Sequence, residues 1–151
     1  MFETELFAGW GDMDFNSHMR NTAYLDKSVD ARMLYFAKQG FSMSEFMKLR
    51  IGPVVMKDEI EYFREIHLLD RITVGFALAG LSADGSRTLL CNEFLREGKL
   101  VARVTSAVGW LDLEKRKLTC PPPALLDAMH ALDKTEDFVE LPSSVNRAQS
   151  S

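Results

Sequence analysis

Long hydrophobic runs, an excess of basic residues and clustered cysteines are all missing from this chain of 151 residues. No apolar run approaches the roughly 18 residues that a membrane-spanning helix needs, and we expect no secretory signal at the N-terminus. The net charge of −4 argues against a general nucleic-acid binder, because such proteins usually carry a basic excess. The two cysteines, Cys91 and Cys120, have no metal-binding or redox spacing, so we expect packing roles for both and a cytoplasmic protein.

The composition indicates one ordinary globular domain. Hydrophobic residues make up 46% and charged residues 26%, which favours neither disorder nor a membrane span. A chain of this length can bury one sizeable core. We place a single domain at residues 1–132 and expect the polar residues 133–151 to be a loosely ordered tail.

Hydrophobic periodicity in the first third of the chain predicts a short strand and then one long helix. Residues 3–9 read as the strand, and a polar loop follows at 12–18. From about residue 22 to 39, apolar residues recur at helical spacing, with Asn21 as a candidate N-cap and Gly40 as the stop. Since apolar side chains cover much of this helix, we expect it to be central and largely buried. Residues 42–50 predict a second, short helix.

The rest of the domain predicts strands. Residues 54–66 look extended, and alternation marks further strands at 72–79, 86–96 and 99–111, with hairpin turns at Asp84-Gly85 and Glu97-Gly98. A short terminal helix is expected at 124–132. The order β-α-β-β-β-β predicts an α+β fold in which one long helix packs against a curved, mostly antiparallel sheet of five strands.

The polar loop before the long helix carries the candidate chemistry, because Asp12, Asp14, Asn16 and His18 alternate along it. An EF-hand calcium loop is excluded, since counting from Asp12 places Ser17 where glycine is required. A transition-metal site made of Asp12, Asp14 and His18 matches no established ligand spacing. The structural alternative is that Asp14 and Asn16 satisfy local backbone N–H groups and that His18 packs against the helix start.

Residues 11–25, GDMDFNSHMRNTAYL, resemble the signature of hotdog-fold thioesterases of the 4-hydroxybenzoyl-CoA type, which include the plant acyl-ACP thioesterases. The resemblance implies a hotdog fold, with a curved sheet wrapped around the long central helix. It also implies that Asp14 is the general base or nucleophile and that Asn16 and His18 accompany it in catalysis. We further expect Asn21, at the helix start, and Tyr24 to bind substrate.

A second, shorter match involves residues 61–65, EYFRE, which resemble the strand that supplies a catalytic glutamate in the plant enzymes. The match implies a catalytic role for Glu65, although alternating acids on a strand are more often a solvated face.

The resemblance further implies an acyl-CoA or acyl-ACP substrate, no metal or organic cofactor, and a homodimer or homotetramer with sites at the subunit boundary. His67 and His130 stand alone in the sequence, and we expect surface or packing roles for them.

Thioester hydrolysis also has a physical rationale in this sequence. A helix start offers free N–H groups and a favourable dipole, so the backbone near Asn21 can polarise a thioester carbonyl while Asp14 acts from the preceding loop. No Gly-x-Ser-x-Gly nucleophile elbow is present. Two other functions stay open: a hotdog-fold dehydratase or hydratase acting on acyl thioesters, and a non-catalytic protein that binds acyl thioesters.

Overall fold

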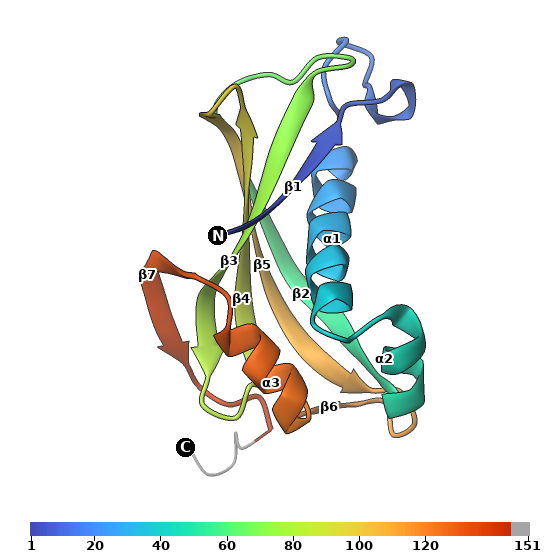
Figure 1. The fold of residues 1–151 in the computed structure, drawn as a ribbon, viewed down its shortest axis with the longest axis vertical. Coiled ribbons are helices and arrows are strands. Elements are labelled where there is room, and N and C mark those ends of the chain that lie inside the picture. The colour runs from blue at the N-terminus through green and yellow to red at the C-terminus, as the bar shows by residue number, and fades with distance from the viewer. Residues whose placement is uncertain (146–151) are drawn as a thin grey trace.

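The computed structural model describes residues 1–145 as an α+β fold (Figure 1). Within these residues, seven strands form one curved sheet in the order β1-β3-β4-β5-β2, with β6 beside β5 and β7 beside β3. All pairings are antiparallel except that of β7 with β3. The strands are β1 (Phe2–Phe7), β2 (Ile51–Tyr62), β3 (Arg71–Ser82), β4 (Arg87–Arg96), β5 (Lys99–Asp112), β6 (Lys117–Thr119) and β7 (Lys134–Leu141). The helices are η1 (Trp10–Asp12), α1 (Asn21–Lys38), α2 (Met43–Leu49) and α3 (Pro123–His130).

Both predicted hairpin turns are present between the antiparallel strands. Glu97 and Gly98 join β4 to β5 with φ angles of 51° and 75°, the paired positive values of a tight hairpin turn. Gly85, in the turn between β3 and β4, has a φ of 75°. A Cβ at this position would lie 2.7 Å from a side-chain carbon of Leu126 and 2.8 Å from one of Pro121, so both conformation and space require glycine.

The long helix α1 packs against the sheet through one face only, unlike the largely buried helix that the sequence predicts (Figure 1). The buried face includes the polar side chains Ser28 and Arg32, whereas Val29 and Leu34 lie on the exposed side at 43% and 44% exposure. Arg32 is tolerated there because its guanidinium donates to Asn92 Oδ1 at 2.8 Å and to Ser106 Oγ at 2.7 Å. No helix in the described part of the chain is long and apolar enough to cross a membrane.

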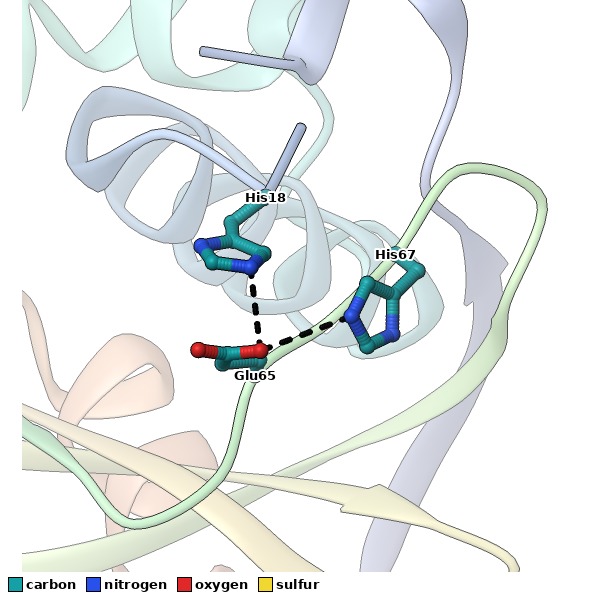
Figure 2. A group of neighbouring side chains, drawn as sticks. All are labelled: His18, Glu65 and His67. Atoms are coloured by element: carbon teal, nitrogen blue, oxygen red, sulfur yellow. Dashed lines mark ion pairs between the residues drawn. The ribbon is translucent and has the colours of Figure 1, made fainter. Parts of the chain in front are cut away.

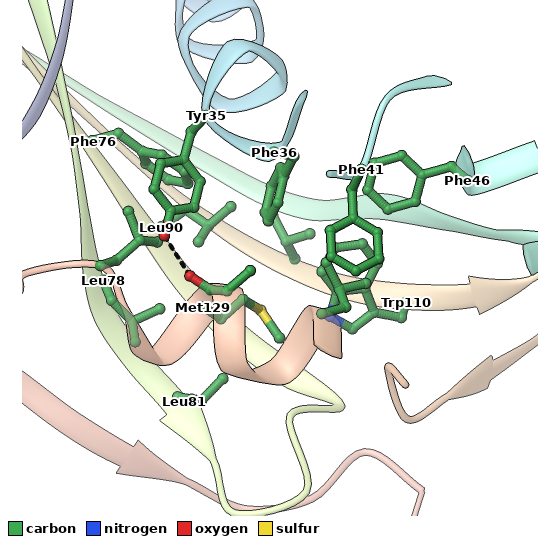
Figure 3. Packing of buried hydrophobic residues seen from close by; sticks show 14 of the residues in the cluster. Tyr35, Phe36, Phe41, Phe46, Phe76, Leu78, Leu81, Leu90, Trp110 and Met129 are labelled. Carbon is green, nitrogen blue, oxygen red and sulfur yellow. Dashed lines mark hydrogen bonds between the residues drawn. The ribbon is translucent and has the colours of Figure 1, made fainter. Parts of the chain in front are cut away.

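Two clusters of buried side chains hold the elements together. In the larger cluster, Phe36 of α1 makes edge-to-face contacts with Phe76 and Trp110 of the sheet (Figure 3). The Tyr35 hydroxyl donates to the carbonyl of Ala128, which ties α1 to α3. The second cluster surrounds the first turns of α1; its members include Met19, Ala23, Tyr24, Ile66, Val74 and Phe94.

The two cysteines differ in their surroundings. Cys91 is buried on β4, as predicted, and burial raises the pKa of its thiol to about 11. Cys120 is exposed, contrary to the expected packing role. The buried thiol is therefore an inert packing group.

The C-terminal part of the chain contributes more to the fold than the sequence predicts. Residues 133–151 are expected to be a loose tail, but Lys134–Leu141 form β7, which pairs in parallel with β3. With β6 and β7, the sheet has seven strands rather than the predicted five within the described residues. The part of the expected tail at 146–151 lies outside the described residues.

Candidate active site

Two segments distant in sequence meet at one end of the sheet: the loop at residues 13–20 and the β2–β3 connection at 63–70 (Figure 1). The backbone N–H of Met19 donates to the carbonyl of Ile66 at 2.8 Å, and Ala8 exchanges backbone hydrogen bonds with Leu69 and Asp70. Met19 and Ile66 are 4% and 0% exposed. Buried side chains beneath the two segments therefore fix how they lie against each other.

A pocket of about 500 Å³ opens where these segments meet the start of α1. Of the six predicted site residues, Asp14, His18, Asn21, Tyr24 and Glu65 line it, and Asn16 does not. The remaining lining residues are Met19 of the loop, Tyr62 at the end of β2, and Phe63 and Arg64 of the β2–β3 connection. The structure thus gathers nearly all the candidate chemistry in one place.

Asp14 is held by the loop in which it lies. Its Oδ1 accepts the backbone N–H groups of Asn16 at 2.8 Å and of His18 at 3.1 Å, as the structural interpretation of this residue expects. The Asp14 N–H donates to the His18 carbonyl at 2.8 Å, which closes the loop. Both side-chain bonds use Oδ1, so the turn does not occupy Oδ2. Asn16 is exposed, and it contributes to the loop through its backbone N–H, which donates to Asp14.

His18 and Glu65 form the closest pair of side chains in the pocket. His18 Nε2 lies 2.9 Å from Glu65 Oε2 (Figure 2). The Glu65 residue follows the end of β2 and belongs to the connection, so its predicted place on a strand is wrong. Arg96 donates to the Glu65 carbonyl and thereby restrains the backbone. A carboxylate at this distance orients the imidazole through a hydrogen bond.

Asp12 has a different partner set from Asp14. Its Oδ2 accepts the Gly9 N–H at 2.7 Å and pairs with Lys27 Nζ at 3.0 Å. Burial alone would raise the pKa of this carboxyl, but the Gly9 hydrogen bond and Lys27 together hold it below its ordinary value. The metal cluster of Asp12, Asp14 and His18 considered from the sequence is therefore not formed, because Asp12 anchors the loop to α1.

Replacing Asp12 by Asn is expected to lower the free energy of unfolding by about 1–3 kcal/mol, because Lys27, only 12% exposed, loses its charge partner. Turnover per folded molecule should stay near that of the wild type. The lowered pKa of Asp12 means that its contribution is fully present above the ordinary value of 3.8 and is lost as the pH falls through the lower pKa of the folded state. Chemical denaturation should show a larger difference between variant and wild type at pH 7 than at pH 3; equal stability at pH 7 would contradict the anchoring role.

The start of α1 differs from the prediction by one residue. Arg20, not Asn21, is the N-cap, and its side chain makes no capping hydrogen bond. Asn21 is the first helical residue, so the expected capping role of Asn21 is wrong. Asn21 is exposed and lines the pocket. Of the first-turn N–H groups, that of Ala23 donates to the Arg20 carbonyl at 3.0 Å, whereas those of Asn21 and Thr22 have no intrahelical acceptor.

Aromatic side chains form one wall of the pocket. Tyr24 is 2% exposed and packs edge-on against Tyr62 and in a tilted geometry against Phe94. Burial raises the pKa of the Tyr24 hydroxyl to about 12, so it stays protonated at neutral pH. Tyr62 and Phe63 are 54% and 48% exposed at the rim. This wall offers apolar surface beside a row of polar groups, the usual make-up of a small-molecule site.

Sequence reasoning missed three neighbours of the predicted residues. Tyr62 and Phe63 line the pocket, and His67 Nε2 lies 3.5 Å from Glu65 Oε2. His67 is 55% exposed, in agreement with the surface role expected for it. The spacing of Glu65 and His67 was the available signal, because residues two apart in an extended segment share a face.

Comparison with known proteins agrees with the fold. Residues 8–129 match the model of the thioesterase-like superfamily, and the chain belongs to this family. A comparison with curated proteins gives no significant match.

Solved structures show the same hotdog fold. A 1,4-dihydroxy-2-naphthoyl-CoA thioesterase from Synechocystis aligns with a TM-score of 0.77 and 19% identity over 87% of this chain and 96% of that chain. A DHNA-CoA thioesterase from Staphylococcus aureus gives a TM-score of 0.77 and 20% identity over 85% and 87%. A hypothetical protein from Staphylococcus aureus, solved in complex with CoA, gives 0.78 and 18% over 97% and 92%.

Proposed function

We propose that this protein hydrolyses acyl-CoA thioesters to a free acid and a thiol. The observation that carries the proposal is the single pocket in which Asp14, the His18–Glu65 pair and the first turn of α1 meet. These are the groups that thioester hydrolysis requires: a base or nucleophile, a proton donor and a site for developing negative charge on oxygen. Family membership supports the same reaction class.

In the proposed mechanism, the thioester carbonyl oxygen faces the N–H groups at the start of α1, near Asn21. The helix dipole and these donors stabilise the oxyanion that forms when the carbonyl is attacked. Asp14 either removes a proton from the attacking water or attacks directly through Oδ2, giving an acyl intermediate that water then hydrolyses. Both routes expel the thiolate.

The other predicted site residues support this step. His18, oriented by Glu65, gives a proton to the departing thiolate. Asn16 acts through Asp14, because its backbone N–H holds Oδ1 in place. Tyr24 contributes a protonated hydroxyl and part of the aromatic wall against which the acyl group packs.

The aromatic wall and the solved relatives guide the choice of substrate. We propose CoA as the carrier, since one structural relative was solved with CoA, and an aromatic acyl group among the candidates, since two others act on such a thioester by name. Acyl carrier protein is the alternative carrier. The proposed hydrolysis uses no metal or organic cofactor.

Product analysis distinguishes this proposal from the two alternatives. The purified protein is incubated with a panel of acyl-CoAs of increasing chain length and with 1,4-dihydroxy-2-naphthoyl-CoA, and both free thiol and acyl products are followed. Hydrolysis predicts equal amounts of thiol and free acid. A dehydratase or hydratase changes the acyl-CoA mass by one water without releasing thiol, and a binding protein changes neither; either result contradicts the proposal.

The second proposal concerns assembly: two copies pair through β2. This strand lies at one end of the sheet order, and Val55 and Met56 on it are 43% and 47% exposed. A long exposed edge strand is commonly covered by a partner. Since Tyr62 ends this strand and Phe63 follows it, such pairing places the pocket at the subunit boundary.

Light scattering is therefore expected to give the mass of a dimer, or of a tetramer built from it. Val55→Lys should shift the mass towards the monomer, because it places a charge in the interface. The matched control, Val139→Lys on β7, changes a valine that is 47% exposed and should leave the assembly intact. A wild-type monomer at micromolar concentration that turned over substrate would refute the pairing.

A further inference from the structure

Three metal-ligating side chains meet at the mouth of the pocket: His18, Glu65 and His67 (Figure 2). Each offers one ligand atom, and the three atoms lie within 4.8 Å of one another. His18 Nε2 is 2.9 Å and His67 Nε2 is 3.5 Å from the same oxygen, Glu65 Oε2. The imidazole rings meet edge to face with centroids 5.5 Å apart.

The backbone sets this arrangement independently of the charges. Ile66, between Glu65 and His67, is fully buried in the second cluster, which turns its two neighbours outwards on the same side. Its carbonyl accepts the Met19 N–H, and Met19 directly follows His18. The three ligands are thus brought together by core packing, and a metal ion would not have to assemble them.

The far side of His67 faces the Asp70 carboxylate at a distance longer than a hydrogen bond. His67 Nδ1 lies 3.7 Å from Asp70 Oδ2, and this carboxylate is fixed by Arg96 at 3.1 Å and by the His67 backbone N–H at 2.9 Å. Histidines that bind metal usually present their second ring nitrogen to such a carboxylate, which sets the tautomer and raises ligand basicity. The arrangement leaves Nε2 as the ligand nitrogen.

The donor set and its spacing suit Zn²⁺. Tetrahedral bonds of about 2.0–2.1 Å separate ligand atoms by about 3.3 Å, and two histidines with one glutamate leave a fourth, open position. The His67–Glu65 separation of 3.5 Å meets this requirement, and the His18–Glu65 contact of 2.9 Å has to open by a few tenths of an ångström. We infer that His18, Glu65 and His67 bind one Zn²⁺ ion, and that this ion inhibits the enzyme reversibly.

The inhibition rests on the proposed function, whereas the metal site itself does not. Two of the three ligands, His18 and Glu65, line the catalytic pocket. A bound ion occupies His18 Nε2 and Glu65 Oε2 together, so the imidazole loses its proton-donor role and the pocket gains a positive charge at its mouth. His67 has no part in the proposed reaction, which makes it the residue that separates metal binding from catalysis.

The test is calorimetric titration of the untagged, reduced protein with Zn²⁺, beside a thiol-release assay. The wild type is expected to bind one ion, and His67→Gln to bind at least about 100-fold more weakly, since loss of an outer partner alone costs 10–100-fold. His130→Gln and Cys120→Ser, which change exposed groups elsewhere, should bind as the wild type does. Micromolar Zn²⁺ should inhibit the wild type, and a chelator should restore it, while His67→Gln keeps full activity with and without the ion.

The outcomes separate the metal site from the proposed function. No Zn²⁺ binding by the wild type, or unchanged affinity in His67→Gln, overturns the site. Binding that His67→Gln abolishes, in a protein that hydrolyses none of the acyl-CoAs, supports the site and refutes the proposed function. Specific binding without any loss of hydrolysis overturns the inhibition.

Discussion

Asp14→Asn is expected to lower kcat by about 10²–10⁴, the range for loss of a positioned acid–base group. The substitution suits the question because the Asn amide oxygen can accept the two N–H groups that now bind Asp14 Oδ1. Only the charge and the free Oδ2 are lost. Substrate affinity and melting temperature should therefore stay close to those of the wild type.

Two comparisons make this result interpretable. Asp26→Asn changes an exposed carboxylate on α1 outside the pocket and should leave kcat unchanged. Asp14→Ala removes the oxygen that holds the loop, so it should lose both activity and stability. If Asp14 served the turn alone, Asp14→Asn would retain more than about a tenth of the wild-type kcat, well short of the expected acid–base loss, and Asp14 would leave the mechanism.

Arg32→Met is expected to lower the free energy of unfolding by about 2–4 kcal/mol, a large share of the stability of a domain this size. Arg32 is 5% exposed and donates to Asn92 Oδ1 and Ser106 Oγ, and Ser106 in turn donates to Asp58. Methionine fills much of the space but donates nothing, so the Asn92 oxygen, fully buried, loses its charged donor.

Arg71→Met is the matched control for this substitution. The Arg71 side chain is 85% exposed and pairs with Glu5 at 3.4 Å, an arrangement worth little in water. Urea denaturation of both variants should show a marked loss for Arg32→Met and almost none for Arg71→Met. If the two variants had the same free energy of unfolding, the hydrogen bonds of Arg32 would make no net contribution to the stability of the fold.

The sequence predicts the succession of strands along the chain and the hairpin turns well because local signals determine them. Alternation in β3, β4 and β5 and the glycines at 85 and 98 act within a few residues. The buried face of α1 was harder to predict, because Arg32 is buried only through partners 60 and 74 residues away. Residues 134–141 are largely polar and read as a tail, but the edge of β3 provides their partner.

In the candidate site, too, the residues within one stretch of sequence could be predicted, whereas those brought in by distant contacts could not. The loop signature identified Asp14, His18, Asn21 and Tyr24, which lie in one stretch of the chain and line one pocket. The role of His67 depends on the contact between Met19 and Ile66, which no local pattern reports. The N-cap was misplaced because Asn21 has a good capping side chain, whereas the backbone turns into the helix one residue earlier, at Arg20.

The location of the chemistry is tested most directly by a crystal structure with a ketone analogue of acyl-CoA, in which a methylene group replaces the thioester sulfur and prevents hydrolysis. The account predicts that the carbonyl oxygen lies about 2.7–3.1 Å from a first-turn N–H of α1. It also predicts that the carbonyl carbon lies about 3–3.5 Å from Asp14 Oδ2 or from a water bound to it. An acyl group bound elsewhere, for example in the pocket lined by Leu6, Phe7 and Leu69, would contradict it.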